Sequence, residues 1–103
     1  MAEELHITEP QRALLQQILA RHLPAGAVVE AFGSRATGVG LKPHSDLDLL
    51  VRAPRPLTVR ELSDLREALS NSALPYAVDV IEPQTVSEAF LSQILAGPRL
   101  AVS

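Results

Sequence analysis

Two neighbouring stretches decide the fold: residues 32–38, which read FGSRATG, and residues 45–51, which read SDLDLLV. The first stretch places glycines and a serine directly after an apolar run, and the second places two carboxylates two residues apart inside another apolar run. In a β-strand, residues i and i+2 lie on the same face. We therefore expect Asp46 and Asp48 to point to one face of a strand, and the leucines and valine that alternate with them to point to the other.

These two aspartates predict a cation site. Two like charges side by side on a largely apolar strand are unfavourable without a counter-charge, which a divalent cation supplies. Asp79 lies in the middle of a later apolar run, residues 77–81 (AVDVI), and completes a three-carboxylate cluster if the two strands are neighbours. Such a cluster suits Mg²⁺, with Mn²⁺ as an alternative, and two such ions can activate an attacking hydroxyl and stabilise a leaving pyrophosphate. The alternative for Asp79 is a lone acid on a solvated strand face.

The glycine-containing turn predicts an anion site opposite the acids. Gly33 lets the backbone approach an anion closely, and Ser34 adds a hydroxyl donor at the start of a short helix. Arg35 and Lys42 flank this turn and are candidates to neutralise phosphate charge. The alternatives are an ordinary strand-to-helix turn with Ser34 as N-cap, and a solvated side chain for Lys42. The glycine patterns of a P-loop and of a dinucleotide-binding fold are both absent from the sequence.

The rest of the chain alternates between helical and strand patterns. Capping boxes at Thr8/Gln11 and at Thr58/Glu61 mark two helix starts, and residues 1–7 are expected to form a frayed start. We predict helices over residues 8–22 and 58–71, and a last helix that opens at residues 86–88 and is closed by Gly97 and Pro98. Strands are predicted over 27–32, 47–51, 77–81 and 100–102, and a turn with a short helix over 33–38. This order favours an α+β (α/β-like) domain with one small sheet.

Composition limits the classes of function. The chain has 103 residues, which suits a single domain over 1–103, and 47% of them are hydrophobic. Nine basic against twelve acidic residues give a net charge of −3, which argues against general nucleic-acid binding. No cysteine, signal peptide or membrane-spanning run is present in the sequence. We therefore expect a soluble cytoplasmic protein without disulfides.

The combination of these motifs resembles the minimal nucleotidyltransferase family of the DNA polymerase β-like superfamily, over nearly the whole chain. The resemblance implies a small mixed sheet of three to four strands with helices packed mainly on one face. It also implies Mg²⁺-dependent transfer of a nucleoside monophosphate, AMP from ATP, to an acceptor hydroxyl. By the family pattern Asp46 and Asp48 hold two metal ions, and Asp79 holds the catalytic metal and helps to deprotonate the acceptor. Thr37 stands at the position where the family commonly has a second arginine, so in this chain Arg35 is the arginine expected to support the phosphate contacts of Gly33 and Ser34.

The resemblance also implies a partner. Family members of this size often pair with a HEPN-domain toxin and act as its antitoxin by adding AMP to a toxin tyrosine. An alternative is a catalytically weak or inactive module that neutralises its partner by masking the partner's active site. A third alternative, a transferase acting on RNA or on a small molecule, is disfavoured by the absence of a second domain and of a basic surface.

Overall fold

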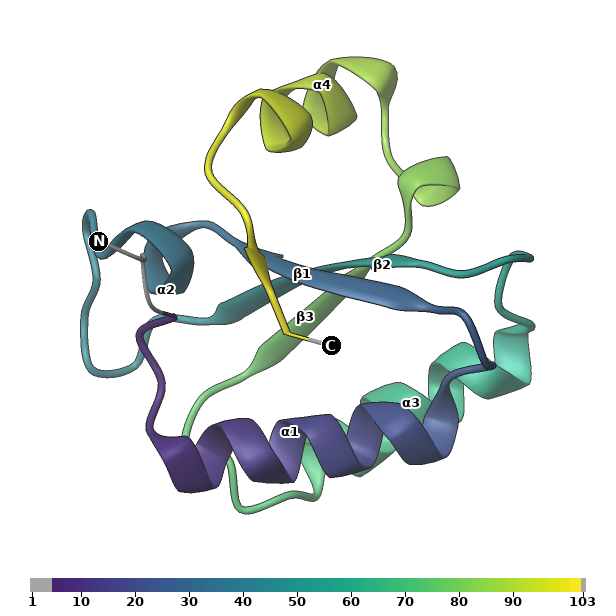
Figure 1. Ribbon diagram of the computed structural model, residues 1–103, viewed down its shortest axis with the longest axis horizontal. Helices are drawn as coiled ribbons and strands as arrows, with labels where there is room; N and C mark the ends of the chain where they lie inside the picture. Colours follow the sequence, from purple (N-terminus) through teal and green to yellow (C-terminus); the bar gives the residue numbers. More distant parts are fainter. Residues whose placement is uncertain (1–4, 103) are drawn as a thin grey trace.

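A four-stranded mixed sheet in the order β3-β2-β1-β4 forms the centre of the structure, a computed structural model that describes residues 5–102 (Figure 1). The strands are β1 (Val28–Phe32), β2 (Leu47–Arg52), β3 (Val78–Ile81) and β4 (Leu100–Ala101). β1 runs antiparallel to both of its neighbours, whereas β2 and β3 run parallel. Parallel neighbours need a crossover connection, and here a helix between β2 and β3 supplies it. The predicted α+β class with a mixed sheet is confirmed.

The two long helices cover one face of the sheet. α1 (Glu9–His22) and α3 (Val59–Ser70) lie side by side beneath the strands, while α4 (Glu88–Ala96) stands over the opposite face (Figure 1). Two short elements connect the strands: α2 (Ser34–Thr37) follows β1, and a 3₁₀ turn, η1 (Pro83–Thr85), follows β3. Within residues 5–102 no helix is long and apolar enough to cross a membrane.

Local sequence signals set the helix boundaries. The Thr8 side chain accepts a hydrogen bond from the Gln11 backbone N–H, and the Gln11 side chain accepts one from the Thr8 N–H, which together form the predicted capping box of α1. Thr58 and Glu61 do the same at the start of α3. These reciprocal bonds satisfy two of the N–H groups that a helix start leaves without intrahelical partners. Both helix starts are therefore confirmed.

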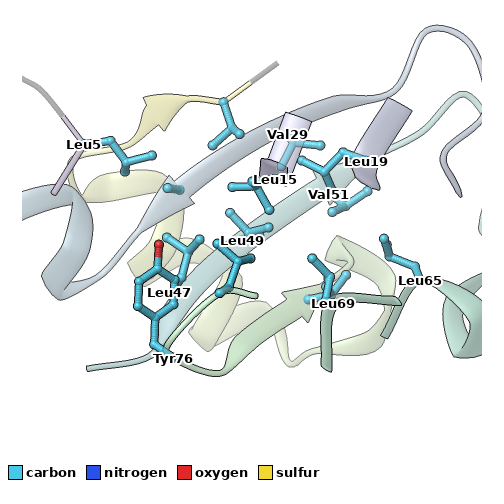
Figure 2. Close-up of a cluster of buried hydrophobic side chains, with 14 of the residues drawn as sticks. Leu5, Leu15, Leu19, Val29, Leu47, Leu49, Val51, Leu65, Leu69 and Tyr76 are labelled. Atoms are coloured by element: carbon cyan, nitrogen blue, oxygen red, sulfur yellow. The ribbon is translucent and has the colours of Figure 1, made fainter. Parts of the chain in front are cut away.

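The main core lies between the sheet and the pair α1–α3 (Figure 2). Alternate residues of β2 enter it, because side chains alternate between the two faces of a strand. Leu47, Leu49 and Val51 are buried in this core, whereas Leu50 is buried on the α4 side, outside the cluster. The other members of the cluster come mainly from the helices and from β1. The strand face that turns away from this core is the one that carries Asp48.

The segment before α1 differs from the sequence prediction. Residues 5–7 were expected to belong to a frayed start, yet Leu5 is buried in the core cluster, and the His6 N–H donates to the Arg35 carbonyl at 2.7 Å. The expectation was wrong for these residues because α2 offers both apolar cover and a backbone acceptor to them. Residues 1–4, the rest of that predicted start, lie outside the described part of the chain.

Candidate active site

The paired strands β2 and β3 bring two of the predicted acids together. In their parallel register, Asp48 is the direct partner of Asp79, so both side chains lie on the same face of the sheet on neighbouring strands. Asp46 precedes β2 by one residue and is exposed to solvent, as is Asp79, whereas Asp48 is half-buried. The sequence predicted a three-carboxylate cluster on the condition that the strands were neighbours. They are neighbours, but the structure places Asp48 beside Asp79 without bringing all three carboxylates into one cluster.

Asp48 is the electrostatic centre of the group. Its burial raises the pKa of its carboxyl above the ordinary value, and the negative charges of Asp79 and then Asp46 raise this pKa further. Both effects disfavour the ionised form of Asp48. The carboxylates are thus close enough to oppose one another's ionisation, which is the situation that a bound cation relieves.

The turn after β1 lies directly against the Asp48 carboxylate. Phe32, the last residue of β1, is the register partner of Asp48, and Gly33 follows it with φ of 75° and ψ of −158°. A Cβ atom placed on Gly33 would lie 2.5 Å from the Asp48 Oδ2. Glycine is therefore required at this position by the backbone conformation and by the space that Asp48 occupies.

The short helix α2 begins immediately after this glycine. Gly33 is its N-cap and Ser34 its first residue, so the alternative that made Ser34 the N-cap is wrong. Gly38 ends the helix with φ of 76°, and its N–H donates to the Ser34 carbonyl at 2.7 Å. The phosphate contacts predicted for Gly33 and Ser34 stay predictions, and their position beside Asp48 is compatible with them.

Arg35 is engaged inside the protein. Its side chain is only 6% exposed, and its guanidinium donates to three backbone carbonyls: Nε to Ser45 at 2.8 Å, Nη1 to His6 at 3.0 Å and Nη2 to Pro43 at 3.1 Å. Three of the five N–H donors of the guanidinium are thereby used, and the group is almost removed from water. The geometry therefore favours a scaffolding role over the nucleotide contact predicted for Arg35.

Lys42 lies in the loop that leads to Asp46. Its side chain is exposed, its N–H donates to the Ser45 Oγ at 2.9 Å, and the Ser45 N–H donates back to the Lys42 carbonyl at 3.0 Å. These reciprocal bonds close a turn immediately before Asp46, and the nucleotide contact of the Lys42 side chain stays a prediction. Sequence reasoning missed Ser45, although a serine directly before an acid in a proline-containing loop is a signal for such a turn.

Tyr76 is the second residue that sequence reasoning missed. Its ring lies under the Arg35 guanidinium, 3.9 Å from centroid to Cζ, and its hydroxyl donates to the Gln11 Oε1 at 3.1 Å. A hollow of about 540 Å³ opens on this side of Arg35, between residues 5–8 and Tyr76, and its lining does not include the three aspartates. A lone tyrosine just before a strand carried no pattern from which this role could be predicted.

The donor set suits a hard cation held partly by other ligands. The three side chains at the site offer oxygen atoms alone, which is the chemistry that Mg²⁺ and Mn²⁺ prefer. Within residues 5–102, however, no three His, Cys, Asp or Glu side chains converge closely enough to hold a metal ion. Mg²⁺ commonly binds through one or two carboxylates, with substrate phosphates and water completing its shell. The site fits such a cation in that form, and not as an all-protein cage.

A small mixed sheet with Asp48 and Asp79 on one face, and with the Gly33 turn packed against Asp48, is the arrangement that the sequence resemblance to nucleotidyltransferases led us to expect. The comparisons with known proteins agree: the chain belongs to the nucleotidyltransferase domain family, whose model matches residues 12–101, and it is a nucleotidyltransferase. It is 39% identical over 87 residues to the probable protein adenylyltransferase MntA of Haemophilus influenzae, over 84% of this chain and 75% of that one.

Solved structures add a similarity of fold. The chain resembles a chain in a crystal structure described as a toxin-antitoxin with AMP-PNP, with a TM-score of 0.72 and 24% sequence identity. The superposition covers 89% of this chain and 72% of the other. The nucleotidyltransferase fold expected from the sequence is thereby confirmed.

Proposed function

We propose that this protein transfers AMP from ATP, with Mg²⁺ as cofactor, to an acceptor hydroxyl, and that the acceptor is a tyrosine of a HEPN-type toxin for which the protein is the antitoxin. The observation that carries the proposal is the placement of Asp48 directly opposite Asp79, with Asp46 beside them and Gly33 packed against the Asp48 carboxylate. The relative named as a probable protein adenylyltransferase and the structural neighbour named as a toxin-antitoxin with AMP-PNP support it.

The chain's own residues divide the chemistry between them. The backbone around Gly33 and Ser34 binds the β- and γ-phosphates of ATP, and Lys42 contributes charge from the neighbouring loop. Asp79, exposed at the edge of the group, accepts the proton of the acceptor hydroxyl. The acceptor oxygen then forms a bond to the α-phosphorus while the bond to the β-phosphate oxygen breaks, so that pyrophosphate leaves with the electron pair.

Asp46 and Asp48 would hold Mg²⁺, which when bound screens the charge of the triphosphate and of the leaving pyrophosphate. Asp48 is placed to do so because its carboxylate lies against Gly33 and its strand runs beside that of Asp79. Burial and, after it, the neighbouring carboxylates raise the pKa of Asp48, and the same cation would relieve the repulsion between the carboxylates.

The test is transfer of label from ATP to a purified HEPN-type toxin. With label on the α-phosphate the toxin becomes labelled, and with label on the γ-phosphate it does not, which separates AMP transfer from phosphorylation. Asp46→Asn and Asp48→Asn should each abolish transfer while the protein stays folded. Asp64→Asn is the matched control, because Asp64 is an exposed acid on α3 whose nearest cation is Arg60, one helical turn away.

Three outcomes would count against the proposal. Label transfer by Asp48→Asn at the normal rate would exclude the metal assignment. An unlabelled toxin that is still neutralised, by wild type and by Asp48→Asn alike, would favour the masking alternative. Label on RNA or on a small molecule, and none on the toxin, would favour the alternative of a transferase that acts on RNA or on a small molecule.

A further inference from the structure

Arg35 fixes the loop that presents Asp46. The guanidinium donates to the carbonyl of Ser45, the residue immediately before Asp46, and to that of Pro43, two residues earlier. On the other side of Asp46, the Leu47 N–H donates to the Ala77 carbonyl at 2.9 Å as β2 joins β3. The backbone of Asp46 is therefore anchored at both of its neighbours, by an arginine on one side and by the sheet on the other.

Tyr76 supports the guanidinium from below. The aromatic ring lies 3.9 Å from the Arg35 Cζ, a distance at which the cation and the ring face attract each other. Tyr76 is itself 9% exposed and packed in the core beside Leu47 (Figure 2), and its hydroxyl donates to the Gln11 side chain of the α1 capping box. A continuous set of contacts thus runs from the start of α1 through Tyr76 and Arg35 to the Asp46 loop.

The arrangement of these contacts is unusual for a buried cation. A guanidinium almost removed from water normally meets a carboxylate, because burying a charge is costly unless it is paired. Arg35 meets three carbonyl oxygens and a ring face, which together satisfy one N–H on each nitrogen, and no carboxylate of residues 5–102 forms an ion pair with it. These carbonyls belong to two separate segments, the loop before Asp46 and residues 5–7, so Arg35 links the two segments through its hydrogen bonds. An ion pair with a single carboxylate would not link them.

We infer that Arg35, supported by Tyr76, is a positioning residue that holds Asp46 in the orientation needed to bind the metal–nucleotide complex. The inference rests on the proposed function, because it takes Asp46 as a metal ligand. It gives the arginine of the GSRATG turn a role that differs from phosphate binding. Arg35 acts through the Ser45 and Pro43 carbonyls and does not itself touch the substrate.

The experiment measures cation binding, so that it does not depend on an acceptor. Mn²⁺ is titrated into the protein with saturating AMP-PNP, and free Mn²⁺ is followed by electron paramagnetic resonance. The variants are Arg35→Met, which keeps the length and loses the donors, Arg35→Lys, and Tyr76→Leu, which removes the ring but leaves the arginine. The matched control is Arg12→Met, because Arg12 also donates to a backbone carbonyl, that of Ala101 on β4, which is separated from β2 by β1.

Loss of an outer-shell partner of a metal ligand lowers metal affinity by about 10–100-fold. We expect Arg35→Met to weaken Mn²⁺ binding within that range. Arg35→Lys should weaken it nearly as much, because an ammonium cannot span three carbonyls, and Tyr76→Leu should weaken it less. Arg12→Met should bind Mn²⁺ as wild type does. Hydrogen exchange of residues 39–46 in the metal-free protein should be faster in Arg35→Met than in the control.

Affinities are compared per folded molecule, which separates positioning from stability. A purely structural role for Arg35 lowers the melting temperature and the folded fraction but leaves the Mn²⁺ dissociation constant unchanged, and that result overturns the inference. If Arg35→Met does not fold, an unchanged dissociation constant in Arg35→Lys and Tyr76→Leu overturns it equally. If the wild-type protein binds no Mn²⁺ in the presence of AMP-PNP, both the proposed function and the positioning role are refuted. If every variant binds Mn²⁺ as tightly as wild type does, only the positioning role is refuted.

Discussion

Substituting Gly33 with alanine tests the link between the turn and the metal site. Gly33 combines φ of 75° with ψ of −158°, a region that residues with a Cβ atom almost never adopt. The new Cβ would also lie 2.5 Å from the Asp48 Oδ2. The change therefore strains the backbone and pushes the carboxylate that we assign to the metal.

Both effects can be given a size. Holding a residue other than glycine in such a region costs about 1–3 kcal/mol. For a domain of this length each kcal/mol lowers the melting temperature by about 4–8 °C, so a fall of roughly 5–20 °C is expected. Ordinary van der Waals contact begins at 3.4 Å, so from 2.5 Å the Asp48 oxygen must retreat by the difference, 0.9 Å. A misplacement of about 1 Å can lower a catalytic rate by about a hundredfold.

The assay compares Gly33→Ala with Gly40→Ala. Gly40 also has positive φ, 71°, but nothing lies within 4 Å of where its Cβ would be. Thermal unfolding gives the stability of each variant, and transfer of α-labelled AMP, corrected for the folded fraction, gives the rate. We expect Gly40→Ala to lose stability and to keep its rate per folded molecule, while Gly33→Ala loses both. Equal rates in the two variants would refute the contact between Gly33 and Asp48 as a functional constraint.

Three further predictions concern stability and are checked by thermal unfolding. The pKa of Asp48 is raised in the folded protein, so the folded protein binds more protons than the unfolded chain at pH values between the unfolded and the folded pKa. The contribution of Asp48 to the free energy of unfolding therefore falls as pH rises through that window. Without metal, Asp48→Asn should be more stable than wild type at neutral pH, and Mg²⁺ should reduce this difference in melting temperature. The hydrogen bonds from Arg55 hold the pKa of Glu61 at about 2, so this ion pair stabilises the fold at pH values above the ordinary glutamate pKa and its contribution is lost as pH falls towards 2. Glu61→Gln keeps the capping box but loses the ion pair. Its melting temperature should lie below that of wild type at neutral pH, and the two should converge as pH falls from the ordinary glutamate pKa towards 2. Leu49→Ala, at a fully buried core position, should lower the free energy of unfolding by about 2–5 kcal/mol, and a loss below 1 kcal/mol would contradict its place in the core.

The features that the sequence predicted are those that depend on local physics. The two capping boxes fixed the starts of α1 and α3, and the alternation of β2 predicted which face Asp48 would occupy. The sequence could suggest that Asp48 and Asp79 lie on neighbouring strands, because the two strands of a strand–helix–strand unit are often parallel neighbours in one sheet. Their direct opposition in the register needed the structure, since a shift along the strand by two residues leaves the same faces buried.

The features that the sequence did not predict depend on contacts between distant segments. Arg35 reads as a basic residue beside an anion-binding turn, and only the folded chain shows that His6, Pro43 and Ser45 surround its guanidinium with carbonyls. Tyr76 is 41 residues away from Arg35 in the sequence, and no periodicity links them. The burial of Leu5 has the same origin, because its cover is contributed by α2 and by the core rather than by its own neighbours in the chain.

The engagement of Arg35 changes the balance of charge at the proposed site. Asp48 and Asp79 lie side by side on one face of the sheet, and Asp46 lies one residue before β2, while the arginine of the turn is committed to backbone carbonyls. Thr37, two residues after Arg35, carries no charge, and its hydroxyl accepts a hydrogen bond from the Val39 N–H at 3.1 Å. A triphosphate approaching this face without cations would be repelled by the carboxylates. On the proposed function, cation and nucleotide are therefore mutually dependent ligands: the carboxylates attract the cation, the cation makes the face acceptable to phosphate, and the phosphate oxygens complete a coordination shell that the protein alone leaves open.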